Sequence, residues 1–137
     1  IIIPTYNCNY SCWYCTQKHH ETELTALDVK RIKRHICLYL TNRNIKSYTL
    51  CWFGGEPLMQ KKEVLNISSF LYQWCMRHGI DFEGQMTSNG ALLDKDTIVS
   101  LKFSHINHFQ ITLDGGRESH NKVKRDNGNK SSFDFDF

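Results

Sequence analysis

Four short apolar runs along the chain, rich in β-branched and aromatic residues, predict β-strands. They cover Ile1 to Thr5, Tyr48 to Phe53, Ile80 to Thr87 and His108 to Leu113. The segments that separate them are longer and mix polar with apolar residues. We therefore expect four strands joined by long connections.

Those connections carry apolar residues at the three- and four-residue spacing of amphipathic helices. The first helix is predicted over Thr25 to Thr41, whose first residue and Asp28 have the form of a capping box. A second helix around Val64 to Cys75 should end at Gly79, and a third should begin at Asp94 as its N-cap. The resulting alternation of strands and helices predicts an α/β fold with a parallel sheet.

Parallel sheets bind ligands at the carboxyl ends of their strands, so the segments that follow the strands are candidates for a site. These segments are Tyr6 to Cys15, Gly54 to Pro57, Ser88 to Gly90 and Asp114 to Gly116. All of them should lie on one rim of the sheet. Residues 1–125 are expected to form this single domain, and the polar residues 126–137 a loosely held tail.

Composition narrows the range of partners. The chain is 40% hydrophobic and 23% charged with a formal net charge of +3, and its basic residues are scattered. This distribution argues against nucleic acid as a partner. No apolar run is long enough to span a membrane, and no signal peptide is recognisable, so we expect a cytoplasmic protein without a membrane partner.

Three of the six cysteines, Cys8, Cys12 and Cys15, fall within eight residues, whereas Cys37, Cys51 and Cys75 stand singly in apolar segments. The single cysteines are expected to act as small buried hydrophobes. Three clustered thiolates could ligate three irons of a cubane cluster and leave the fourth iron open. The same spacing also suits a Cys3His zinc site completed by His19 or His20, or thiols without a metal.

The segment from Cys8 to Cys15 resembles the C-x3-C-x2-C signature of the radical S-adenosylmethionine (radical SAM) enzymes, including an aromatic residue, Tyr14, before the last cysteine. The resemblance implies a [4Fe-4S] cluster on Cys8, Cys12 and Cys15, with S-adenosylmethionine chelated by the free iron. Reductive cleavage of this cofactor yields a 5′-deoxyadenosyl radical that abstracts hydrogen from a substrate. It also implies a parallel-sheet partial (β/α)6 TIM-like barrel, of which the pattern supplies the first four strands.

Further segments resemble cofactor-binding motifs of this family. Gly54, Gly55, Glu56 and Pro57 are similar to its GGEP motif, which implies close approach of the backbone to the ligand and a Glu56 carboxylate that accepts from the amino group of S-adenosylmethionine. Thr87 to Gly90 is similar to its T-x-N-G motif, which brings Ser88 and Asn89 to the cofactor.

The segment after the last strand resembles that of the peptide-modifying branch. The resemblance implies that Thr112 contacts the ribose, that Asp114 belongs to the same site, and that Lys124 or Arg125 holds the carboxylate end of the cofactor. Lys124 occupies the place of an arginine in that branch. The backbone of Tyr14 is expected to line the adenine.

These motifs together resemble the SPASM-type peptide and protein maturases, such as the anaerobic sulfatase-maturing enzymes. The resemblance implies a peptide or protein substrate and an electron donor such as flavodoxin or ferredoxin, with no protein side chain assigned as catalytic. The alternatives are a zinc-binding structural module and a degenerate barrel that holds a cluster without turnover.

Overall fold

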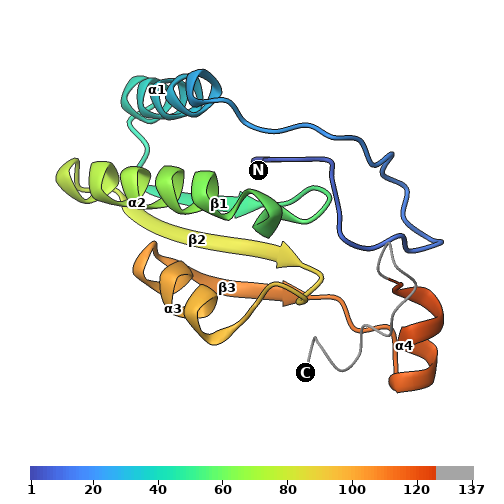
Figure 1. Cartoon of the computed structure of the whole chain (residues 1–137). Helices are drawn as coiled ribbons and strands as arrows, with labels where there is room; N and C mark the ends of the chain where they lie inside the picture. The colour runs from blue at the N-terminus through green and yellow to red at the C-terminus, as the bar shows by residue number, and fades with distance from the viewer. Residues whose placement is uncertain (126–137) are drawn as a thin grey trace.

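A three-stranded parallel sheet organises residues 1–125, the part of the chain that the computed structural model describes (Figure 1). Its strands are β1 (Ser47–Trp52), β2 (Asp81–Ser88) and β3 (Ile106–Ile111), in the order β1-β2-β3. The predicted α/β fold with a parallel sheet is confirmed. The tail expected at 126–137 lies outside the described residues.

The first predicted strand is reduced to a single bridge, between Ile2 and Trp52. The Ile2 N–H donates to the Cys51 carbonyl at 2.8 Å, and the Phe53 N–H donates to the Ile2 carbonyl at 3.1 Å. The prediction of a full strand here was wrong because Pro4 has no N–H with which to extend the ladder. The segment nevertheless runs parallel to β1 at the edge of the sheet.

The helices are α1 (Ala26–Asn42), the 3-10 helix η1 (Pro57–Gln60), α2 (Lys61–Arg77), α3 (Lys95–Phe103) and α4 (Arg117–Val123). Thr25 and Asp28 form the predicted capping box of α1, and the Asp94 side chain accepts from the Thr97 N–H at the start of α3. Helix α4 was not predicted because its sequence is polar, with only His120 buried. Within the described residues, no helix is both long and apolar enough to cross a bilayer.

One face of the sheet packs against α2 and α3, with α1 beside α2 (Figure 1). Alternate strand residues such as Leu50, Trp52 and Met86 enter this core and are nearly inaccessible to solvent. The Trp52 Nε1–H donates to Ser68 Oγ on α2 at 2.9 Å, which satisfies the buried indole. This packing fixes the sheet against the helices. The carboxyl ends of the three strands point toward α4 and the loop that precedes α1 (Figure 1).

Candidate functional site

A cavity of about 260 Å³ opens at the carboxyl ends of the strands. The cysteine loop, the turn after β1, the end of β2 and the residues around α4 contribute to its walls. The predicted residues that line it are Cys8, Cys12, Tyr14, Cys15, Gly54, Gly55, Ser88, Asn89, Thr112 and Lys124. The other predicted residues, Glu56, Pro57, Asp114 and Arg125, do not line it.

All six cysteines are free thiols, and the three clustered ones share the cavity. Cys8 Sγ accepts from the Tyr10 N–H at 3.4 Å and from Asn89 Nδ2 at 3.7 Å. Burial raises the pKa values of both Cys8 and Cys12 above that of an ordinary thiol. A metal bound here therefore has to displace thiol protons.

Of the two histidines that could complete a zinc site, His19 contacts a clustered cysteine and His20 does not. His19 Nε2 is 3.5 Å from Cys15 Sγ, whereas the His20 ring stacks on Tyr6 with centroids 4.9 Å apart. Across residues 1–125, no three His, Cys, Asp or Glu side chains converge closely enough to hold a single ion. A four-iron cluster takes one thiolate per iron, so its cysteines need only face a common cavity.

Gly54 and Gly55 let the cysteine loop lie directly against the turn after β1. A Cβ on Gly55 would stand 2.1 Å from the Asn7 carbonyl oxygen, and one on Gly54 would stand 2.6 Å from that of Thr5. Gly54 also has a φ of +135°, which disfavours any side chain. The Gly55 N–H donates to Thr5 O at 3.1 Å and the Glu56 N–H to Asn7 O at 2.9 Å. The turn thus anchors the chain just before Cys8.

The Glu56 carboxylate is fully buried and is bonded to neighbouring groups of the protein. It accepts from the Leu58 N–H at 3.0 Å, the Asn89 N–H at 2.8 Å and Ser88 Oγ at 3.1 Å. Burial raises its pKa, although these bonds and the charge of Lys124 oppose the rise. Glu56 therefore joins the turn after β1 to the end of β2.

Asn89 connects the end of β2 to the cysteine loop. Its Nδ2 donates to Asn9 Oδ1 at 2.8 Å, in addition to its contact with the Cys8 sulfur. Its Oδ1 accepts from the Ala91 N–H at 3.0 Å, which fixes the turn that contains Gly90. The position of Cys8 is therefore set by both β1 and β2.

Lys124 is almost inaccessible to solvent and its ammonium lies in the cavity wall. Its Nζ donates to the Asn89 carbonyl at 3.0 Å and to the Thr112 carbonyl at 2.5 Å, and lies 5.8 Å from the centroid of the Tyr10 ring. Arg125 is exposed, and its carbonyl accepts from the Ser11 N–H at 3.0 Å. Of the two basic residues proposed from the sequence, Lys124 is the one at the cavity.

Tyr14 is tied to the segment after β3 by its hydroxyl, which donates to Asp114 Oδ2 at 3.1 Å. Burial and this bond raise the pKa of the Tyr14 phenol. The Asp114 N–H in turn donates to Nδ1 of the buried His120 at 3.3 Å. Asp114 thus acts through Tyr14, holding the cysteine loop against the end of β3.

Sequence reasoning missed the roles of Tyr10 and His120. Tyr10 lies between two cysteines and is buried under Lys124. His120 and Lys124 stand four residues apart, so the helical turn places both on one buried face of the α4 segment. That four-residue spacing was the available signal, but the polar sequence around it gave no helical periodicity.

The cavity suits a metal cluster with a small carboxylate-bearing molecule beside it. Three thiols face it from one side, and glycine backbone, the Asn89 amide, the Thr112 residue and the Lys124 ammonium complete its walls. Only three cysteines contribute, which leaves one iron of a four-iron cluster without a protein ligand. Such an arrangement can hold a small molecule directly against the open iron.

Comparison with known proteins supports this interpretation. The sequence model of the Radical SAM superfamily matches residues 2–135 of the chain. The Fe-coproporphyrin III synthase of Methanosarcina barkeri (strain Fusaro / DSM 804) is 26% identical over 134 residues, which cover 95% of this chain and 30% of that protein.

Solved structures of the anaerobic sulfatase-maturing enzyme anSMEcpe share the fold. The form with bound AdoMet and the Cp18Cys peptide has a TM-score of 0.74 and 20% identity, covering 96% of this chain and 35% of that one. The hexahistidine-tagged form with bound AdoMet has a TM-score of 0.75 and 19% identity, covering 97% of this chain and 36% of that one. The chain thus spans about a third of the length of these relatives.

Proposed function

The chain belongs to the radical SAM superfamily, whose cofactors are a [4Fe-4S] cluster and S-adenosylmethionine, and we propose that it serves in the modification of a peptide or protein. The main observation behind the proposal is that three cysteines line the same cavity as Gly55 and Lys124. These cysteines are Cys8, Cys12 and Cys15. When bound, the two cofactors supply a 5′-deoxyadenosyl radical for hydrogen abstraction.

Different residues around the cavity bind the cluster and the parts of S-adenosylmethionine. Cys8, Cys12 and Cys15 hold the cluster, and the Lys124 ammonium attracts the carboxylate end of S-adenosylmethionine as a point charge. Thr112 takes the ribose and the backbone of Tyr14 lines the adenine, as the family resemblance implies. Glu56, Ser88 and Asp114 belong to the same cofactor site, as the resemblance implies, and they also position its wall, because Ser88 bonds Glu56 and Asp114 bonds Tyr14.

The peptide substrate is proposed from the resemblance of the motifs to the maturase branch and from the peptide-bound forms of anSMEcpe. The similarity to Fe-coproporphyrin III synthase makes an iron tetrapyrrole the competing substrate class. We further propose an electron donor such as flavodoxin or ferredoxin. The free cysteines are consistent with a cytoplasmic, reducing environment.

The test is reductive cleavage of S-adenosylmethionine by the anaerobically reconstituted chain. With dithionite as reductant, mass spectrometry should detect 5′-deoxyadenosine from the wild type and the Cys37→Ala control, but not from Cys12→Ala. Absence of 5′-deoxyadenosine from the wild type at full iron content would contradict the proposal. Modification of a tetrapyrrole but no peptide would replace the proposed substrate class.

A further inference from the structure

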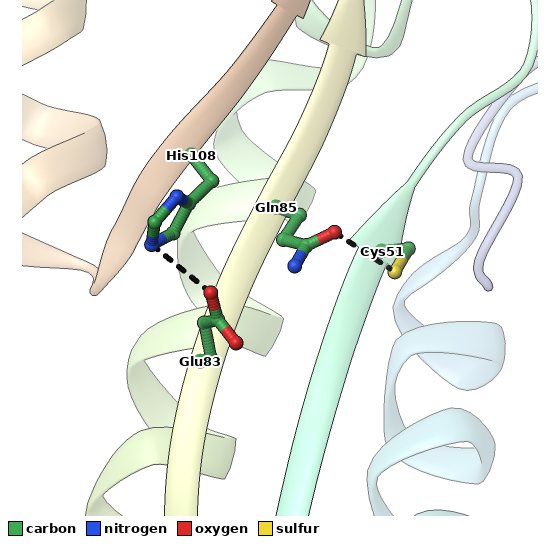
Figure 2. A network of polar contacts seen from close by, with 4 residues as sticks. All are labelled: Cys51, Glu83, Gln85 and His108. Carbon is green, nitrogen blue, oxygen red and sulfur yellow. Dashed lines mark hydrogen bonds and ion pairs between the residues drawn. The ribbon is translucent and has the colours of Figure 1, made fainter.

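Side-chain amides face the sulfurs of Cys8 and Cys51 with opposite polarity. The Cys51 thiol donates to Gln85 Oε1 on the neighbouring strand at 3.7 Å, and Figure 2 shows the amide oxygen turned toward the sulfur. At the strand ends, Asn89 Nδ2 donates to Cys8 Sγ, also at 3.7 Å. An oxygen suits a protonated thiol, whereas an N–H group suits a thiolate, which has no proton to donate. The amide at Cys8 therefore has the polarity that a metal-bound cysteine requires.

The orientation of the Asn89 amide follows from its other hydrogen bonds. Its Oδ1 accepts from the Ala91 N–H at 3.0 Å, and its Nδ2 donates to Asn9 Oδ1 at 2.8 Å. An amide nitrogen carries two N–H groups, so the second is left for Cys8. A flipped amide would set Nδ2 against the Ala91 N–H, with two donors facing each other. The bond to Ala91 thus determines which end of the amide faces the sulfur.

The backbone of Asn89 is held on both sides by buried charged groups. Its N–H donates to Glu56 Oε2 at 2.8 Å, and its carbonyl accepts from Lys124 Nζ at 3.0 Å. Glu56 and Lys124 are both almost inaccessible to solvent. The Asn89 side chain therefore extends from a fixed point, and its N–H group is oriented toward Cys8 before any metal binds.

Iron binding changes which hydrogen bonds the Cys8 sulfur can make. The Cys8 thiol donates to Asn9 Oδ1 at 4.0 Å, and its sulfur accepts from the Tyr10 N–H at 3.4 Å as well as from Asn89. A cysteine ligand loses its thiol proton, so only the two bonds from N–H donors remain. Hydrogen bonds to the sulfurs are among the factors that set the reduction potential of an iron–sulfur cluster. Because reduction adds negative charge, such donors stabilise the reduced form more than the oxidised form.

We propose that the Asn89 side-chain amide donates a hydrogen bond to the Cys8 thiolate of the bound cluster and thereby raises the reduction potential of that cluster. In this role Asn89 acts through Cys8 and is a positioning residue. Its amide makes the transfer of one electron from a donor such as flavodoxin or ferredoxin more favourable. The inference deepens the proposed function and rests on it for the bound cluster.

The experiment is a redox titration of the anaerobically reconstituted chain without S-adenosylmethionine, followed by electron paramagnetic resonance. In Asn89→Ser, the hydroxyl can still accept from the Ala91 N–H in the same kind of turn, but the amide nitrogen is gone. The ratio of reduced to oxidised cluster at a given potential should fall about tenfold. For one electron, this change corresponds to a midpoint about 59 mV lower. The matched control Asn9→Ser removes the other acceptor of Nδ2 and should titrate as the wild type does.

A second measurement detects the hydrogen bond itself. The wild type is labelled with nitrogen-15 at the side-chain amides of its asparagines, and pulsed electron paramagnetic resonance of the reduced cluster should show a nitrogen-15 coupling. The coupling should persist in Asn9→Ser and disappear in Asn89→Ser. Circular dichroism and iron analysis confirm that each variant is folded and loaded, and if Asn89→Ser holds no cluster, the wild-type spectrum decides.

Absence of the coupling from the wild type would overturn the inference. So would a loaded Asn89→Ser with the wild-type midpoint, or an equal shift of the midpoint in Asn9→Ser. Cleavage of S-adenosylmethionine is assayed separately. A chain that shows the coupling and the shifted midpoint but yields no 5′-deoxyadenosine would contradict the proposed function and leave the role of Asn89 intact.

Discussion

At the scale of single residues, the site depends on contacts that no larger side chain permits. Gly55 touches the backbone of Asn7, one residue before Cys8, and the Glu56 N–H donates to the same Asn7 carbonyl. The position of the first cysteine therefore follows from the absence of a side chain at residue 55. Gly54 and Gly55 thus support the cysteine loop and also line the cavity at the strand ends.

The first prediction concerns Gly55→Ala. The added Cβ would stand 2.1 Å from the Asn7 oxygen, so either the turn or the cysteine loop must move. We expect Tm to fall by about 5 °C or more, and cluster iron to fall with it. Gly116→Ala is the matched control, because nothing lies within 4 Å of its added Cβ. Equal Tm and iron content in the two variants would show that the loop does not depend on this contact.

Glu56 gives a pH-dependent prediction. Because burial raises its pKa, the folded chain retains this proton at pH values where the unfolded chain has released it. The stability that the protonated carboxyl contributes is complete below the ordinary pKa of 4.5 and is lost as pH rises through the raised value. As pH rises from 4.5 through the raised pKa of Glu56, the Tm of the wild type should therefore fall relative to the Tm of Glu56→Gln. Thermal unfolding of both proteins by circular dichroism measures the difference, and a pH-independent difference would refute it.

At the scale of elements, capping residues predicted where helices begin more accurately than apolar runs predicted the extent of strands. Thr25 and Asp28 identified the start of α1, and Asp94 that of α3, because a side-chain cap is a local interaction. The first apolar run contained equally suitable residues, yet Pro4 limited it to one bridge. In helix α4 the buried residue is His120, and its neighbours are polar. The sequence therefore lacks the regular spacing of apolar residues that predicts a helix.

The junction between β1 and α2 provides the element-scale prediction. Ser68→Ala removes the acceptor of the buried Trp52 indole N–H and should lower the free energy of unfolding by about 1–3 kcal/mol. Ser100→Ala on α3 is the control, because its hydroxyl bonds an exposed carbonyl within the same helix. Denaturant unfolding of both variants measures the effect. A loss for Ser68→Ala no larger than that for Ser100→Ala would mean that the indole finds another partner.

At the scale of the whole molecule, the parallel topology explains why distant motifs meet. The strand-end rule was sufficient to predict that Cys8, Gly55 and Asn89 share one rim. It could not predict the hydrogen bonds of Glu56, because the donors Ser88 and Asn89 lie more than thirty residues away. Nor could it choose between Lys124 and Arg125, since that choice depends on which face of the α4 segment is buried.

The central claim is that Cys8, Cys12 and Cys15 hold a four-iron cluster with one iron open to S-adenosylmethionine. The most direct test is electron paramagnetic resonance of the anaerobically reconstituted, dithionite-reduced chain with and without that cofactor. The account predicts a [4Fe-4S]⁺ spectrum whose g values change when S-adenosylmethionine is added, with the signal lost in Cys12→Ala and retained in Cys37→Ala. A cluster spectrum that S-adenosylmethionine leaves unchanged, or one that survives in Cys12→Ala, would contradict it.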